Sequence, residues 1–208
     1  MTTVVHLVRH AAHDDVGSYL AGRTPGVLLG EAGLAQAARV ARKLRGEKID
    51  FIQSSPIERA AQTAHAIASY HDAKVELIDA LVEVDFGDWS GKTFGELNEQ
   101  PHWRMWNVAR GITTTPGGET MLGVQARVIG HILDMVQLRK GATLLMVSHA
   151  DPIRAALAAI LGLSLDRLIS FDIDPASLST IAFDDYGAVV RRVNEPAPAD
   201  HTSAGGPT

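Results

Sequence analysis

The stretch VVHLVRH, residues 4–10, predicts a short buried β-strand that ends at Arg9 and His10. A second apolar run, TLLMVSH at residues 143–149, predicts another buried strand, which ends at His149. In an open parallel sheet the carboxyl ends of the strands border the ligand crevice, and strands far apart in the sequence can meet there. We therefore expect the two histidines to contribute to one site.

Helices and strands alternate along the rest of the chain. The hydrophobic periodicity predicts a helix over 31–45, a strand over 50–53, a strand over 75–78, a helix over 119–138, a helix over 153–161, and strands over 178–183 and 188–193. Residues 85–117 show no regular pattern and are expected to be irregular. This alternation predicts an α/β fold, a three-layer sandwich with a mostly parallel central sheet and helices on both faces. We expect a single domain over 1–194 and a flexible tail over 195–208, where few large apolar residues occur.

Composition excludes several classes of function. The chain has 208 residues, no cysteine and a formal net charge of -5. Disulfides, thiolate zinc sites and cysteine nucleophiles are therefore excluded, and the charge disfavours nucleic acid or an anionic membrane as a partner. The sequence contains neither a long apolar span nor a signal peptide, so we expect a cytoplasmic protein. A homodimer is compatible with the sequence, which does not report the oligomeric state.

Two helix starts lie close to the predicted strand ends. The stretch SSPIE, residues 54–58, contains a capping box from Ser55 to Glu58 with proline at the first helical position, which puts Arg59 in the first turn. Asp151, followed by a proline, is likewise predicted to cap a helix. A helix amino terminus offers free N–H groups to an anion, and Arg59 adds a guanidinium there. This end of the sheet is therefore suited to a phosphate group.

The residues at the predicted strand ends form an unusual set: Arg9, His10, Arg59, Glu83 and His149. Arginines bind phosphate oxygens with two parallel hydrogen bonds, and an imidazole can attack phosphorus as a nucleophile. A carboxylic acid can protonate the departing alkoxide. The set indicates phosphoryl transfer through a phosphohistidine.

The sequence resembles the histidine phosphatase superfamily, in its phosphoglycerate mutase-like branch, over nearly all of the predicted domain. Four stretches carry the resemblance: LVRH at 7–10, SSPIERAAQTA at 54–64, EVDFGDWSG at 83–91 and VSHA at 147–150. The resemblance implies that His10 is the phosphorylated nucleophile and that Arg9, Arg59 and His149 bind the phosphoryl oxygens. It also implies that Glu83 acts as general acid and then as general base, with no cofactor and no metal.

The sequence departs from the family pattern just after the nucleophile. Where the family usually has glycine, a variable residue, threonine and, three positions later, asparagine, this chain has Ala11, Ala12, His13 and Val16. Two polar phosphate contacts of the family are thereby put in doubt. His13 either replaces the hydroxyl contact or is a partly exposed histidine without a catalytic role.

Other substrate contacts are predicted with less support from the sequence. Ala150 stands where glycine is common in the family, but it keeps the backbone N–H that can face phosphate. Arg23 is a further candidate contact. Trp103 and Trp106 either pack a surface loop onto the core or belong to a roof that selects the leaving group, as the matching region of the family does. On the second hypothesis, replacing Trp106 alters substrate preference.

We therefore predict a metal-independent phosphatase that hydrolyses a phosphate monoester of a small metabolite. The segment between Glu83 and the long helix is compact, whereas the mutases of this family usually carry a longer insertion there. Three alternatives stay open: a phosphoglycerate mutase-type phosphomutase, a non-catalytic protein that binds a phosphorylated ligand, and a metal-dependent hydrolase. The ligands of such a metal would come from His10, His13, Asp14, Asp15, His149 and Asp151.

Overall fold

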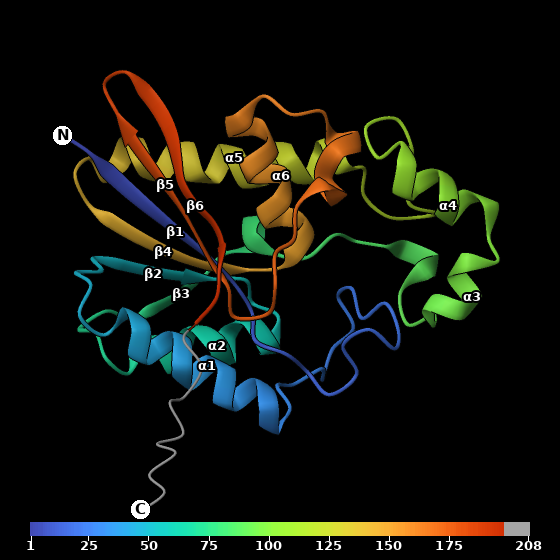
Figure 1. The fold of residues 1–208 in the computed structure, drawn as a ribbon, viewed down its shortest axis with the longest axis horizontal. Coiled ribbons are helices and arrows are strands. Elements are labelled where there is room, and N and C mark those ends of the chain that lie inside the picture. Colours follow the sequence, from blue (N-terminus) through green and yellow to red (C-terminus); the bar gives the residue numbers. More distant parts are fainter. Residues whose placement is uncertain (198–208) are drawn as a thin grey trace, which may run out of the picture.

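The computed structural model describes residues 1–197, which form an α/β sandwich around one six-stranded sheet (Figure 1). The strand order is β3-β2-β4-β1-β5-β6. Neighbouring strands from β3 to β1 pair in parallel, whereas β5 pairs antiparallel with both β1 and β6. The strands are β1 (Thr3–Arg9), β2 (Phe51–Ser54), β3 (Val75–Leu77), β4 (Thr143–Ser148), β5 (Leu178–Asp184) and β6 (Gly187–Glu195). The predicted fold class is confirmed.

Two pairs of helices cover the two faces of this sheet (Figure 1). Helices α1 (Glu31–Leu44) and α2 (Glu58–Ala68) pack on the face that carries Val8, and α5 (Met121–Leu138) and α6 (Ala150–Leu161) pack on the opposite face. Successive side chains of a strand point to opposite faces, so each central strand contributes to both halves of the core. Such double coverage explains why the sequences of β1 and β4 are apolar almost throughout.

The region expected to be irregular contains two short helices, α3 (Phe94–Asn98) and α4 (Pro101–Val108). Thr93 and Glu96 form a capping box at the start of α3, and Pro101 occupies the first turn of α4. These helices lie to one side of the sheet and pack through a third apolar cluster that includes Trp89 and Trp106. They are too short to show a helical hydrophobic period, which explains why the prediction missed them.

Both predicted helix caps are wrong. Helix α2 begins at Glu58 after an extended Ile57, and the hydroxyl of Ser55 instead accepts a hydrogen bond from the Ile57 amide, at 3.2 Å. Helix α6 begins at Ala150, so Asp151 lies inside its first turn rather than before it. Both side chains are engaged elsewhere, the Ser55 hydroxyl with His149 and the Asp151 carboxylate with Arg110.

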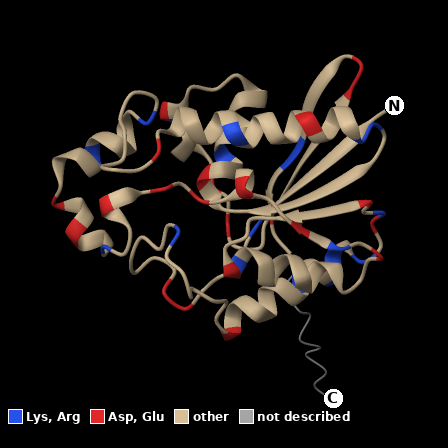
Figure 2. Cartoon of the chain, turned by 180° about the vertical axis from the view of Figure 1, so that it is seen from behind, with Lys and Arg blue, Asp and Glu red and all other residues tan. Residues whose placement is uncertain are grey.

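The end of the described chain continues past the predicted domain boundary. β6 includes Glu195, and the carbonyl of Pro196 accepts a hydrogen bond from Lys43 at 2.9 Å. Residues 198–208, which make up most of the predicted tail, lie outside the described residues. Acidic and basic residues are interspersed along the ribbon (Figure 2). No helix within residues 1–197 is long and apolar enough to cross a membrane.

Candidate active site

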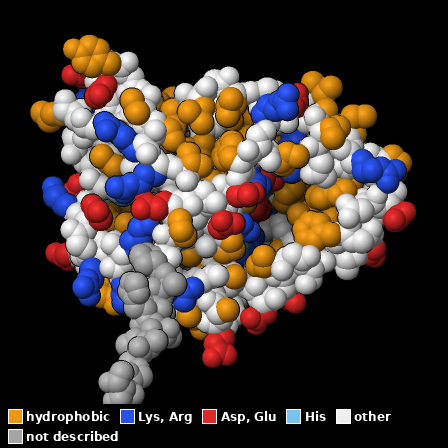
Figure 3. All heavy atoms as spheres, in the orientation of Figure 1, with side chains coloured by type: hydrophobic (Ala, Val, Ile, Leu, Met, Phe, Trp, Pro, Cys, Tyr) orange, Lys and Arg blue, Asp and Glu red, His pale blue; other side chains and the backbone are white. Residues whose placement is uncertain are grey.

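A cavity of about 280 Å³ lies at the carboxyl ends of β1 and β4. Figure 3 shows a hollow on this side of the molecule, with charged side chains on one border and hydrophobic ones on the other. The cavity wall brings together side chains from elements far apart in the sequence, including Arg9, His10, His13, Arg59, Glu83, Ala150, Arg110, Asp151 and Arg154. The expectation that separate strand ends would meet at one site is correct.

His10 follows the end of β1 and is buried. Its Nδ1 lies 2.7 Å from the carbonyl oxygen of Ala11, which can only accept a hydrogen bond, so Nδ1 carries the ring proton. The lone pair is therefore on Nε2, which accepts a hydrogen bond from Nε of Arg59 at 3.1 Å. Burial, followed by the charges of Arg59 and Arg9, holds the pKa of His10 well below its usual range. The imidazole is thus neutral and nucleophilic at Nε2 around neutral pH.

The two arginines beside His10 use only some of their N–H groups for hydrogen bonds to other described residues. Arg59 donates from Nη2 to the carbonyl of Gly22 at 2.7 Å, and Arg9 donates from Nη1 to the carbonyl of Ile173 at 2.6 Å. Among the described residues, neither Nη1 of Arg59 nor Nε of Arg9 has a hydrogen-bond partner, although both atoms are buried. Buried donors without partners are costly, so these atoms are suited to an anionic ligand.

His149 lies just before α6 and is fully buried. Its ring centroid is 5.0 Å from that of His10. Nδ1 faces Nη2 of Arg59 at 3.3 Å and can only accept there, so Nε2 donates to the Ser55 hydroxyl at 2.8 Å. Burial, with the nearby His10 and Arg59, holds the pKa of His149 well below its usual range. The Ser55 side chain, expected as a helix cap, therefore orients an imidazole of the site.

Glu83 is the carboxyl group of the cavity that is placed to act as an acid. Burial, followed by the charge of Asp151, raises the pKa of Glu83 to about 7. Its Oε1 accepts a hydrogen bond from the Val84 amide at 2.9 Å. Arg23 and Arg127 donate to the backbone carbonyl of Glu83, at 2.8 and 3.1 Å. The predicted substrate contact Arg23 is thus not brought to the cavity wall; it holds the backbone of the acid instead.

His13 lines the cavity and is 9% exposed, which favours a ligand contact over the alternative of a partly exposed histidine; its role in catalysis stays a prediction. The centroid of its ring lies 6.3 Å from that of His10, and its Nδ1 has no hydrogen-bond partner within the described part of the chain. The Ala11 amide donates a hydrogen bond to the Thr63 hydroxyl at 3.0 Å, so this amide is not available to a ligand. His13 is therefore the side chain after the nucleophile that is free to contact a ligand. Ala150 also lies on the cavity wall, as predicted.

The residues considered as metal ligands are not gathered into one cluster. Asp14 and Asp15 are exposed and line a neighbouring hollow, whereas Asp151 is buried between two arginines. Within residues 1–197, no group of three or more histidine and acidic side chains is arranged to hold a metal ion.

Sequence reasoning missed several cavity residues. Arg110 and Arg154 bind the carboxylate of Asp151, and no sequence pattern pairs Arg110 with a residue 41 positions away. Trp103 lines the cavity, whereas Trp106 is completely buried behind it and does not, so the roof hypothesis applies to Trp103. The two tryptophans are three residues apart on α4, so the sequence alone does not show which side chain faces the cavity. The direction in which α4 packs against the core decides this.

A neutral histidine with a free Nε2 lone pair lies at the strand ends of this α/β sandwich, beside arginine donors that have no partner among the described residues and a carboxyl group of raised pKa. Such an arrangement is suited to phosphoryl transfer. The family model for the histidine phosphatase superfamily (branch 1) matches residues 5–196, and the chain belongs to this superfamily.

Relatives of known structure or function agree with this assignment. Phosphoserine phosphatase 1 of Hydrogenobacter thermophilus is 34% identical over 192 residues, which cover 90% of each chain. The solved structure of YhfR from Bacillus stearothermophilus superposes with a TM-score of 0.87 at 25% identity, over 93% of this chain and 97% of that one. A phosphoserine phosphatase of Entamoeba histolytica, solved with phosphoserine, gives a TM-score of 0.84 at 27% identity, over 92% and 96%.

Proposed function

We propose that this protein hydrolyses phosphate monoesters of small metabolites through a phosphohistidine at Nε2 of His10. One observation carries the proposal: the hydrogen bond from Nδ1 of His10 to the Ala11 carbonyl leaves the Nε2 lone pair beside Arg59. Glu83, an acid with a pKa near 7, lines the same cavity. A cavity of about 280 Å³ suits a small ester.

In the first step the phosphoryl group replaces Arg59 at the Nε2 lone pair and is held by the free N–H groups of Arg59 and Arg9. Nε2 attacks phosphorus, the P–O ester bond breaks, and Glu83 gives its proton to the departing alkoxide. The guanidiniums stabilise the negative charge on the equatorial oxygens, which is the dominant contribution in such transfers. The alcohol then leaves, and Glu83 is ionised.

In the second step ionised Glu83 takes a proton from a water molecule, whose oxygen attacks the phosphohistidine. The P–N bond breaks, its electron pair returns to Nε2, and inorganic phosphate is released. Glu83 is protonated again, so the cycle restores the starting state. A phosphomutase shares the first step and differs in that the alcohol, not water, receives the phosphoryl group.

The test is phosphate release from p-nitrophenyl phosphate in excess EDTA by the wild-type protein, His10→Ala and the matched control His65→Ala. His65 is exposed on α2, away from the cavity wall. We expect activity in EDTA for the wild type and for His65→Ala, and a loss on the order of 1,000-fold or more for His10→Ala.

The other outcomes correspond to the alternatives. Activity that EDTA removes and added metal restores contradicts the proposal and supports a metal-dependent hydrolase. Isomerisation of phosphoglycerate without phosphate release supports a mutase, and phosphate binding without turnover supports a binding protein. A cytoplasmic location and the exclusion of nucleic acid and membrane as partners stay predictions from the sequence, which is also compatible with a homodimer.

A further inference from the structure

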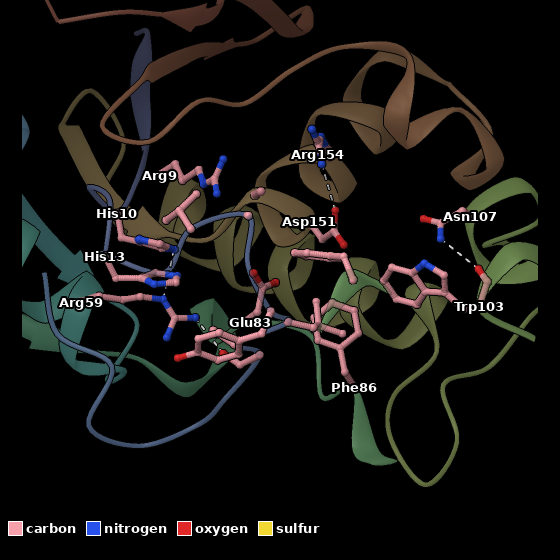
Figure 4. Close-up of a pocket in the computed structure, with 18 of the residues that line it drawn as sticks. Arg9, His10, His13, Arg59, Glu83, Phe86, Trp103, Asn107, Asp151 and Arg154 are labelled. Carbon is pink, nitrogen blue, oxygen red and sulfur yellow. Dashed lines mark hydrogen bonds and ion pairs between the residues drawn. The ribbon is translucent and has the colours of Figure 1, made fainter. Parts of the chain in front are cut away.

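Glu83 lies on a stretch of backbone that belongs to neither a helix nor a strand. The stretch, residues 82–86, runs between two short 3₁₀ turns, Asp79–Leu81 and Gly87–Trp89. Figure 4 shows Glu83 between the part of the cavity that holds His10 and the part that holds Asp151. A general acid must lie within hydrogen-bond reach of the departing oxygen, and small displacements are costly. Contacts other than those of regular secondary structure must therefore fix this backbone.

Two arginines outside the cavity wall hold the backbone of the acid. Arg23 donates from Nε to the Glu83 carbonyl at 2.8 Å, and Arg127 donates from Nη2 to the same oxygen at 3.1 Å. Nη1 of Arg127 also donates to the Ala80 carbonyl at 2.7 Å. These hydrogen bonds take the place of those that a helix or a sheet would supply to the backbone. The position of Glu83 therefore depends on side chains from distant parts of the sequence.

Glu119, two residues before α5, binds both of these arginines. Its Oε2 accepts a hydrogen bond from Nη2 of Arg23 at 2.7 Å, and its Oε1 accepts one from Nε of Arg127 at 3.1 Å. Oε2 also accepts a hydrogen bond from the Asp85 amide at 3.0 Å, and the Glu119 amide donates to the Asp85 carbonyl at 2.9 Å. One carboxylate thus fixes both guanidiniums and the backbone that follows the acid.

This network is charged and partly shielded from solvent. The side chains of Glu119, Arg23 and Arg127 are 27%, 34% and 19% exposed. Although burial opposes ionisation, the hydrogen bonds from Arg127 and the Asp85 amide, with the charges of the two arginines, keep the pKa of Glu119 below its usual range. The hydrogen bonds between these side chains are therefore charge-assisted, which makes them stronger than hydrogen bonds between neutral groups.

We propose that Glu119 is a positioning residue for the general acid: through Arg23 and Arg127 it holds Glu83 within reach of the leaving oxygen. The inference rests on the proposed phosphatase function and adds a residue that does not line the cavity. A displaced acid slows the reaction most when the leaving group needs a proton. An alkoxide needs one, whereas p-nitrophenolate leaves as an anion around neutral pH. The role therefore predicts a loss of activity that depends on the leaving group.

The first test compares two aromatic substrates of similar size, benzyl phosphate and p-nitrophenyl phosphate, in Glu119→Gln. We measure kcat/KM because it covers the steps up to P–O cleavage and not the later hydrolysis of the phosphohistidine. It should fall about 10- to 100-fold for benzyl phosphate and less than about threefold for p-nitrophenyl phosphate. The matched control is Glu99→Gln, because Glu99 is exposed just after α3 and outside the cavity wall; both constants should stay unchanged.

A second variant, Arg23→Ala, removes one of the two arginines that connect Glu119 with the acid. The Arg23 side chain is one-third exposed, so its removal leaves the core intact, and this variant decides alone if Glu119→Gln fails to fold. We expect the same selective loss on benzyl phosphate and an unchanged Ki for inorganic phosphate as a competitive inhibitor. A Ki that rises as much as kcat/KM falls means that phosphate binding is lost, which contradicts the positioning role.

Glu83→Gln distinguishes a failure of this inference from a failure of the proposed function. It should lose kcat/KM for benzyl phosphate far more than for p-nitrophenyl phosphate. If it does so while Glu119→Gln and Arg23→Ala lose activity equally on both substrates, the acid is assigned correctly and the positioning role is wrong. If Glu83→Gln itself shows equal losses, or the wild type releases no phosphate from p-nitrophenyl phosphate, the proposed function is contradicted and the inference with it.

Discussion

Two carboxyl groups on the same cavity wall, the half-buried Glu83 and the buried Asp151, are given opposite charge states by their surroundings. Glu83 accepts a backbone hydrogen bond, and burial raises its pKa to about 7. Asp151 lies between two guanidiniums, which keep its pKa below the usual range despite burial. Titratable groups whose pKa values are pushed apart commonly mark an acid and a fixed charge. Here Glu83 exchanges the proton, and Asp151 contributes a permanent negative charge that favours the protonated acid.

This arrangement predicts the pH dependence of the first chemical step. For an alkyl phosphate, kcat/KM of the wild-type enzyme should fall above about pH 7 as Glu83 loses its proton. Asp151→Asn removes a negative charge that raises the Glu83 pKa, so the descending limb should move to lower pH. The measurement is the pH profile of kcat/KM, with Asp134→Asn on the exposed side of α5 as control. A limb that stays in place or moves to higher pH contradicts this role of Asp151.

At the scale of elements, α4 carries two tryptophans whose surroundings differ. Trp106 is completely buried, with its ring centroid 6.1 Å from that of Trp89. Trp103 meets the same ring edge-on at 5.2 Å, but it also forms part of the cavity wall. One residue therefore fixes the helix to the core, and the other faces the leaving group.

The two tryptophans should separate stability from specificity. Trp106→Ala should lower the free energy of unfolding by about 3–5 kcal/mol, because a large ring is removed from a packed cluster. Trp103→Ala should change the kcat/KM ratio between p-nitrophenyl phosphate and glycerol 3-phosphate by a larger factor than Trp106→Ala does. Urea unfolding and steady-state kinetics on both variants check this. If Trp106→Ala changes this kcat/KM ratio by the larger factor, the sequence-based hypothesis that Trp106 selects the leaving group is supported instead.

A site residue can be predicted from the sequence when its neighbours along the chain determine its position, and not when its role depends on a distant residue. His10 and His149 follow apolar strands, and that pattern alone places them at the edge of a buried sheet. The role of Ser55 was predicted wrongly because its partner, His149, is 94 positions away in the sequence. The Arg110 contact with Asp151 was missed for the same reason. Local patterns predict strand ends, whereas side-chain partners across the cavity require the fold.

At the scale of the whole molecule, folding buries imidazoles in and beside the central strands. His6 lies within β1, and His10 and His149 follow β1 and β4. Burial is the first cause that lowers the pKa of each of them. In the unfolded chain these imidazoles return to a pKa of about 6.5. The unfolded state therefore binds more protons at these positions than the folded state once the pH falls below that value.

Because of this difference, the free energy of unfolding should decrease as the pH falls from 7.5 to 5.5. Glu83 acts in the opposite direction, since its pKa of about 7 in the folded state makes it hold a proton that the unfolded chain releases, but it opposes three histidines. Urea unfolding across this pH range measures the slope. His149→Gln should flatten it, Glu83→Gln should steepen it, and His65→Ala, on the exposed side of α2, should leave it unchanged. A wild-type protein that is equally stable or more stable at pH 5.5 would show that the buried imidazoles take up protons without unfolding.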